Sequence, residues 1–183
     1  MKKPTLKNIY FVFLMLVLSS SCTSNLNFDQ VNDLKLTPIA VANLTYFEAP
    51  AHEFVTNGVE TNAAFGAQNF DAFRDSFFKD NLIQADFFFE ITNTINRAYT
   101  IDLVLVDEFD QILYSINFVV PASTGTPRVV TKTEIFKDAK LALLKQTKKM
   151  GFRVIMAPGP ALTENSPGSL KLRSSATVYM EIQ

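Results

Sequence analysis

Few side chains in this 183-residue chain have the types and spacing that catalysis requires. The single histidine, His52, is followed by Glu53, and such a pair can serve acid–base chemistry. The chain has no G-x-S-x-G elbow, no phosphate-binding glycine loop and no H-E-x-x-H zinc motif. We therefore interpret His52 as a solvated loop residue and expect no catalytic residue, no metal site and no cofactor.

Clustered acids are the other candidates for chemistry. Asp107, Glu108 and Asp110 could supply oxygen ligands to Ca²⁺, but the order and the glycine of an EF-hand loop are missing. We interpret this run as an acidic hairpin turn. Three further acids surround the start of a short predicted helix, where the helix dipole favours negative charge: Asp71, Asp75 and Asp80.

Residues 1–21 have the three-part layout of a secretory signal peptide. Three lysines fall within the first seven residues, residues 9–18 are all apolar, and three serines precede Cys22. The apolar run is shorter than the roughly 20 residues that a membrane-spanning helix needs. The segment is therefore expected to direct export and to be removed.

The serines and Cys22 resemble the lipobox of bacterial lipoproteins. Cys22 is the only cysteine of the chain, so it has no partner for an internal disulfide. Ser19 stands where a lipobox usually has leucine, and Leu18 lies one position further back. The resemblance implies that Cys22 becomes the first mature residue and carries acyl chains such as palmitate. A soluble secreted protein with a free thiol is the alternative.

Residues 22–34 are rich in Asn, Asp and Ser and read as a lipidated tether. Residues 22–47 resemble the opening of small outer-membrane lipoproteins of Bacteroidetes-type bacteria, a resemblance that carries no known chemistry. Residues 23–26 are uncharged, whereas surface-exposed members often have an acidic run there, which favours a periplasm-facing anchor. Without residues 1–21 the net charge is −4, which argues against nucleic-acid binding and against a polybasic membrane dock.

Residues 35–183 are predicted to form one mainly β domain, an antiparallel Ig-like β-sandwich of about seven strands with one amphipathic helix. Apolar residues alternate with mostly polar ones over residues 83–92 and face one side: Ile83, Ala85, Phe87, Phe89 and Ile91. Residues 83–120 are expected to form a three-stranded meander. Further strands are expected at residues 36–48, 70–73, 128–133, 152–156 and 170–182, and helices at residues 75–81 and 134–148.

The many phenylalanines admit two interpretations. The cluster between Phe70 and Phe89 suits the core of the sandwich, and the alternative is an apolar cleft for a ligand. Phe88 lies on the otherwise polar face of its strand. We expect the helix at residues 134–148 to cover it, because Phe136 and Leu143 need an apolar surface.

The loop at residues 157–168 contains three prolines and two glycines and is the candidate for recognition. We expect it to have little role in packing and to contact a partner through five residues: Pro158, Pro160, Leu162, Asn165 and Pro167. The hypothesis is a lipid-anchored, non-enzymatic binding or structural module of the cell envelope. Alternatives are a carrier of an apolar ligand near the Phe cluster and a carboxylate-based hydrolase.

Overall fold

The computed structural model describes residues 35–61, 63–70 and 75–182. Leu36–Ile182 form one compact unit. The predicted signal peptide, Cys22 and the tether therefore lie outside the described residues. Within the described ranges, no helix is long and apolar enough to cross a bilayer.

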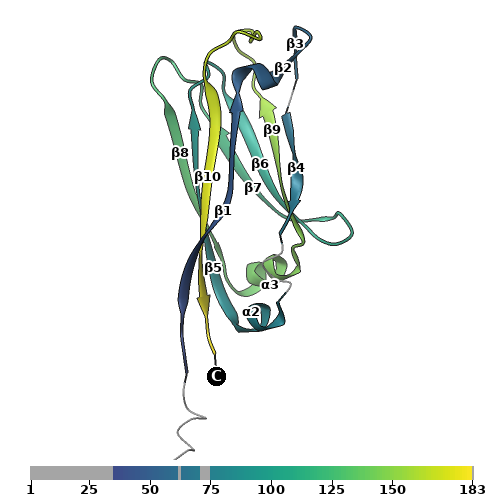
Figure 1. The fold of residues 1–183 in the computed structure, drawn as a ribbon, viewed down its shortest axis with the longest axis vertical. Coiled ribbons are helices and arrows are strands. Elements are labelled where there is room, and N and C mark those ends of the chain that lie inside the picture. The colour runs from purple at the N-terminus through teal and green to yellow at the C-terminus, as the bar shows by residue number, and fades with distance from the viewer. Residues whose placement is uncertain (1–34, 62, 71–74, 183) are drawn as a thin grey trace, which may run out of the picture. The chain divides into compact units, whose positions relative to one another are not determined.

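The larger unit consists mainly of β-strands (Figure 1). In chain order its elements are β1 (Ile39–Pro50), η2 (Ala51–Phe54), β2 (Val55–Thr56), β3 (Val59–Glu60), β4 (Ala63–Asn69), α2 (Ser76–Asn81), β5 (Leu82–Asn93), β6 (Tyr99–Val106), β7 (Ile112–Val120), β8 (Arg128–Phe136), α3 (Asp138–Gln146), β9 (Lys149–Met156) and β10 (Ser169–Met180).

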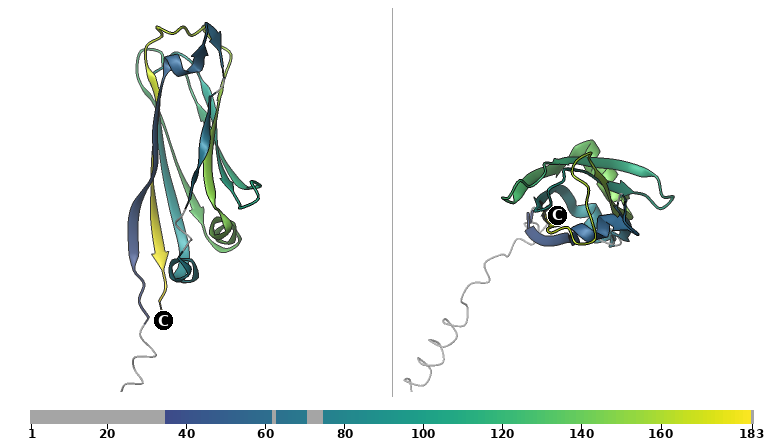
Figure 2. Two further views of the ribbon diagram at one scale, coloured as in Figure 1. Left: turned by 45° about the vertical axis from the view of Figure 1, so that its right-hand side comes forward. Right: turned by 90° about the horizontal axis from the view of Figure 1, so that it is seen from above.

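Two four-stranded sheets pack face to face, as the views in Figure 2 show. One sheet has the order β1-β10-β5-β8 and the other β4-β9-β6-β7, while β2 and β3 form a small separate ribbon. All the pairings within the two sheets are antiparallel. The predicted antiparallel β-sandwich is thus confirmed, and its eight-stranded order is that of a jelly roll.

The predicted meander is wrong at its first connection. β5 pairs with β10 and β8, whereas β6 pairs with β7 and β9 in the opposite sheet. Residues 94–98 therefore cross between the sheets instead of closing a hairpin. Only the β6–β7 hairpin follows the prediction. The polar turn residues that close a hairpin also suit a crossing between sheets, so local sequence does not separate the two.

The alternation predicted for β5 is confirmed over most of the strand. Ala85, Phe87, Phe89 and Ile91 are fully or almost fully buried. Ile83 was expected on the same face but is exposed. A register shift in the pairing with β10 places Leu82, not Ile83, in the core at this end of the strand, because each one-residue slip reverses the face on which side chains lie.

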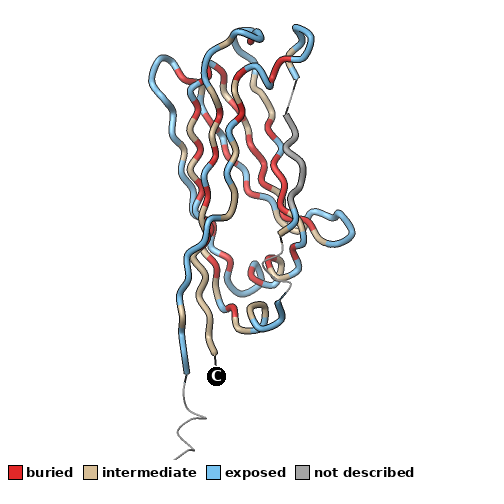
Figure 3. The backbone as a smooth tube through the Cα atoms, viewed as in Figure 1, coloured by how far each residue is buried: buried red, intermediate tan, exposed pale blue. Residues whose placement is uncertain are grey.

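Aromatic rings fill the space between the sheets. The ring centroids of Phe87 and Phe136 are 4.9 Å apart, and those of Phe89 and Phe118 are 5.5 Å apart. All four side chains are buried. Figure 3 colours buried residues red along the strands of both sheets. These rings form the core, as the first interpretation of the Phe cluster expected. Of the short strand predicted at residues 70–73, Phe70 follows β4, and the rest lies outside the described residues.

The predicted helix at residues 134–148 begins four residues late. Glu134 and Phe136 are buried on the inner side of β8, opposite Phe87 and Ala85 of β5 respectively, while Ile135 faces outward. The β-branched run that precedes them favours continued strand. α3 therefore starts at Asp138.

Phe88 is consequently not covered as predicted. Its side chain retains 41% exposure on the outer face of its sheet, with Thr133 and Ser175 as cross-strand neighbours. The residues that α3 buries are Leu141 and Leu144, not the predicted Leu143. Phe88 contributes to a surface and is not held under the helix.

The strands give the sandwich two distinct ends. At one end, which we call the loop end, Ser169 of β10 pairs with Pro50 and the loops 94–98, 121–127 and 157–168 lie close together (Figure 1). At the other, the tether end, Leu36 pairs with Ile182, and the Glu181 amide donates to the Asn81 carbonyl of α2. β10 spans 12 residues between them, roughly 40 Å.

Phe89→Ala should lower the free energy of unfolding by about 3–5 kcal/mol, because it removes a fully buried ring from the core. Glu90→Ala on the outer face of the same strand should change it by less than about 0.5 kcal/mol. Urea unfolding of both variants measures the difference. Equal losses would contradict the assigned strand register.

Candidate functional site

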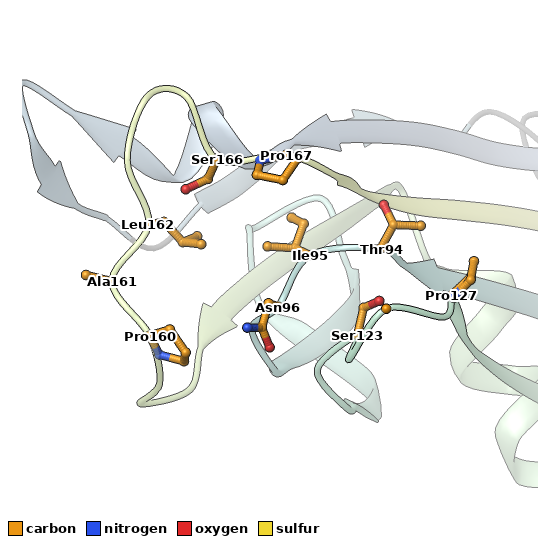
Figure 4. Close-up of a pocket in the computed structure, with 11 residues that line it drawn as sticks. Thr94, Ile95, Asn96, Ser123, Pro127, Pro160, Ala161, Leu162, Ser166 and Pro167 are labelled. Atoms are coloured by element: carbon orange, nitrogen blue, oxygen red, sulfur yellow. The ribbon is translucent and has the colours of Figure 1, made fainter.

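A pocket of about 540 Å³ opens at the loop end of the sandwich (Figure 4). Its walls come from three loops that are far apart in the sequence. The lining residues are Thr94, Ile95, Asn96, Ser123, Gly125, Pro127, Pro160, Ala161, Leu162, Ser166 and Pro167. None of these eleven residues has an ionisable side chain.

Asn93 holds the first loop in place. Its buried amide nitrogen donates to the carbonyls of Arg97 and Pro121, at 2.7 and 2.9 Å, and its oxygen accepts from the Ile95 amide at 2.9 Å. The Ser123 amide donates to the Ile95 carbonyl at 2.9 Å. These bonds join the loop at residues 94–98 to the loop at residues 121–127.

Arg97 connects the same loop to the other side of the pocket. Its side chain is 4% exposed, donates to the Pro160 carbonyl at 2.7 Å and forms an ion pair with Glu60 of β3. The second Glu60 oxygen accepts from the Leu162 amide at 2.7 Å. Gly159 lies so close that a Cβ there would be 3.0 Å from Arg97 Cδ. One buried cation thus organises three segments.

Gly168 ends the proline-rich loop and requires the absence of a side chain. Its φ is +98°, and a Cβ would lie 2.6 Å from the Thr94 carbonyl oxygen. The Thr94 amide donates to the carbonyl of the adjoining Ser169 at 3.0 Å, and the Ser169 amide donates to the Thr94 hydroxyl at 2.8 Å. Two pocket loops therefore meet directly here.

The structure gathers some of the predicted recognition residues and not others. Pro160, Leu162 and Pro167 line the pocket, whereas Pro158 and Asn165 lie elsewhere on the loop. The expectation that this loop has little role in packing is wrong for Leu162, which is 8% exposed and belongs to the core. A long loop that covers the end of a sandwich must bury part of itself to shield the core.

Sequence reasoning missed the other two walls of the pocket. Residues 94–96 were expected only as a connection within the predicted meander, and no role was predicted for Ser123, Gly125 and Pro127. Their composition, rich in Ser, Thr, Gly and Pro, predicts loops but not which loops meet. The jelly-roll strand order brings them together, and that order depends on pairings between distant segments.

The pocket offers hydrogen bonds and apolar contact without charge. The Asn96 amide and the hydroxyls of Thr94 and Ser166 stand beside proline, isoleucine and leucine side chains (Figure 4). The Thr94 hydroxyl accepts from the Ser169 amide and donates to its carbonyl, which leaves one lone pair to accept from a ligand, and the Ser166 hydroxyl accepts from the Thr163 amide. Such a lining suits a neutral ligand with both polar and apolar parts.

The acidic run at the β6–β7 turn has a structural role, as predicted. One Asp107 carboxylate oxygen accepts from the amides of Phe109 and Gln111, each at 2.8 Å. Asp110 forms an ion pair with Lys149, with the nitrogen and oxygen 2.5 Å apart. Asp107 thus closes its own hairpin, and Asp110 connects the turn to β9.

Other ionisable side chains cap a helix, lie exposed or pair on the surface of a sheet. Asp75 caps α2 as predicted, accepting from the Phe77 amide at 2.8 Å, and His52 is exposed in η2. On the outer face of a sheet, hydrogen bonds from Arg153 and Asn117 lower the pKa of the Asp102 carboxyl. Among the described residues, no three metal-binding side chains gather into a group.

A polar contact attaches α3 to the sheets. Glu134 accepts from the Tyr114 hydroxyl at 2.6 Å and from Lys140 at 2.5 Å. Burial raises the pKa of this carboxyl, but the two hydrogen bonds outweigh that effect and the pKa is lowered. Burial also raises the pKa of the Tyr99 hydroxyl far above its ordinary value, so this phenol stays neutral.

Comparisons with known proteins find similarity in structure alone. No protein-family model matches the chain, and no curated protein matches it. The VP2 subviral particle of infectious bursal disease virus is similar with a TM-score of 0.44 and 8% identity, over 79% of this chain and 32% of that one. Desmodium yellow mottle tymovirus is similar with a TM-score of 0.31 and 12% identity, over 81% of this chain and 84% of that one. Bacillus endospore appendages, described as disulfide-linked pili, are similar with a TM-score of 0.30 and 12% identity, over 87% of this chain and 96% of that one.

Glu60→Gln should destabilise the fold by about 3 kcal/mol, because it leaves the buried Arg97 charge without its counter-charge. Arg97→Met should cost less, since the Glu60 side chain is 30% exposed and can be hydrated. Urea unfolding of each variant and of the double variant measures the two losses in the free energy of unfolding and the coupling between the side chains. A larger loss for Arg97→Met would show that packing, not charge, holds the loops.

Proposed function

We propose that this chain is a lipid-anchored, non-enzymatic lipoprotein of the cell envelope, and that its loop-end pocket binds an uncharged segment of another envelope protein. The observation that carries the proposal is the position of the pocket. It opens at the end of the sandwich opposite Leu36, where the chain arrives from the predicted tether. A module anchored through Cys22 would present this pocket away from the bilayer.

The anchor part of the proposal rests on the first 34 residues. The lysines, the apolar run and the single cysteine match the layout of an exported lipoprotein. Attachment by two or three acyl chains would be stable, because each buried CH₂ contributes about 0.8 kcal/mol. We place the anchor in the outer membrane, facing the periplasm.

The binding part of the proposal is supported by the rigidity of the pocket walls. Hydrogen bonds from the Asn93 and Arg97 side chains, and those between Thr94 and Ser169, connect the loops. A preformed pocket lowers the entropy that a ligand must lose on binding. An extended peptide carries amide groups for Asn96 and the hydroxyls, and side chains for the prolines, which matches the mixed lining.

Carriage of an apolar ligand between the sheets remains the alternative function. The rings of Phe87 and Phe136 contact each other in the space that such a ligand would need. A ligand there would have to separate the sheets. The packing of these rings therefore favours the binding module over the ligand carrier. Lipid extracted from the purified protein in equimolar amount would favour the carrier instead.

Cys22→Ala should move the protein from the detergent phase to the aqueous phase, or leave it as an unprocessed precursor, because the acyl acceptor is lost. Phase partition and metabolic labelling with palmitate measure the effect in cells. Ser24→Ala, two residues further on, is the matched control and should leave labelling unchanged. Normal processing and membrane association of the Cys22 variant would contradict acylation.

A photo-crosslinking residue at Asn96 or Ala161, on opposite walls of the pocket, should capture the same envelope protein in cells. The same residue at Val119, exposed on the outer face of a sheet, should not capture it. Mass spectrometry of the crosslinked products identifies the partner and the contacting segment. Capture from Val119 alone would place recognition elsewhere and contradict the pocket.

A further inference from the structure

The tether end of the sandwich carries exposed aromatic side chains. Phe109, at the tip of the β6–β7 turn, is 74% exposed, and Phe77 of α2 is 54% exposed. Large apolar side chains in these positions are costly to hydrate and gain nothing from the fold. Both views of Figure 2 place the β6–β7 turn apart from the body of the strands.

The turn that presents Phe109 is held rigidly. Asp107 accepts two backbone hydrogen bonds within the turn, and its own amide donates to the Gln111 carbonyl at 3.0 Å. Asp110 has a φ of +60° and is paired with Lys149 of β9. The exposed Phe109 ring is therefore held in place by the hydrogen bonds and the ion pair of its turn.

Three lysines and two acidic residues lie beside this aromatic position. A hollow of about 270 Å³ beside the turn is lined by Lys79, Asp107, Glu108, Phe109, Lys145, Gln146 and Lys148. It joins α2, α3 and the β6–β7 turn on one side of the tether end. Aromatic rings next to lysines, whose long stems reach from apolar surroundings to water, are typical of surfaces at a membrane interface.

The length of the predicted tether also favours contact between the tether end and the bilayer. Residues 22–36 span at most about 50 Å when fully extended. The strands between the two ends occupy roughly 40 Å of that distance. For the loop end to touch the bilayer, the tether would have to stretch almost completely, at a large loss of entropy. The tether end can reach the bilayer with the tether relaxed.

We propose that the tether end rests on the surface of the lipid bilayer, with Phe109 and Phe77 entering the boundary between headgroups and acyl chains and the lysines at the level of the phosphates. The inference rests on the proposed function, because the anchor at Cys22 holds the domain near the bilayer. Tethering raises the local concentration of the surface, so two aromatic side chains suffice to orient the domain.

The test uses the full lipidated protein in vesicles of phosphatidylethanolamine and phosphatidylglycerol. The chain has no tryptophan, so Phe109→Trp introduces a single fluorescent reporter. Its emission should shift to shorter wavelength in the vesicles and should be quenched by lipids brominated on their acyl chains. Val59→Trp, at an exposed position of β3 at the loop end, is the matched control and should show neither effect. Phe77→Trp provides a second reporter that should behave like Phe109→Trp.

Flotation with the vesicles separates the two proposals. A Phe109→Trp protein that does not float contradicts the anchor and the bilayer contact together. If it floats but brominated lipid does not quench its indole fluorescence, the bilayer contact alone is contradicted. A shift of the indole emission without quenching would indicate a protein neighbour at this surface and would also overturn the inference.

Discussion

A single buried cation determines how the loop end of this sandwich is built. The guanidinium of Arg97 reaches both Glu60 of β3 and the carbonyl of Pro160, which lines the pocket. A charge with so little access to water must be paired, so the segments that supply its partners are held where it needs them. Because Glu60 also accepts from the Leu162 amide, the pair positions the proline-rich loop over the core.

The jelly-roll order makes such a tie necessary. Residues 94–98 carry the chain from one sheet to the other. After Thr94, whose amide donates to Ser169 of β10, the backbone pairs with no strand of either sheet until β6 begins at Tyr99. Asn93 supplies two of the missing bonds, and Arg97 connects the end of the crossing to two further segments. The same requirement to satisfy buried polar groups thus closes the fold and shapes the pocket walls.

Local patterns predicted the strands well and their partners poorly. The alternation around Phe87 and Phe89 follows from the pleat of one strand, so it could be read from the residues themselves. The neighbours of that strand are β8 and β10, which are distant in sequence, and nothing near residue 93 distinguishes a crossing from a hairpin. Likewise, Glu134 and Phe136 fit a helical spacing, but pairing with β5 keeps them in a strand. The candidate site shows the same division: Pro160 and Pro167 were recognisable from loop composition, whereas the other walls become a site only when the fold brings them together.

The two ends of the molecule can differ in role because the strands between them are continuous. β10 runs without interruption from Ser169, beside the pocket, to Met180, beside α2, and β5 runs antiparallel to it over the same length. Because the two sheets form one rigid body, a contact that orients one end of the sandwich also orients the other end. If Phe109 and the lysines near it settle on a bilayer, the direction in which the pocket opens follows from the fold, without any further contact along the sides of the sandwich.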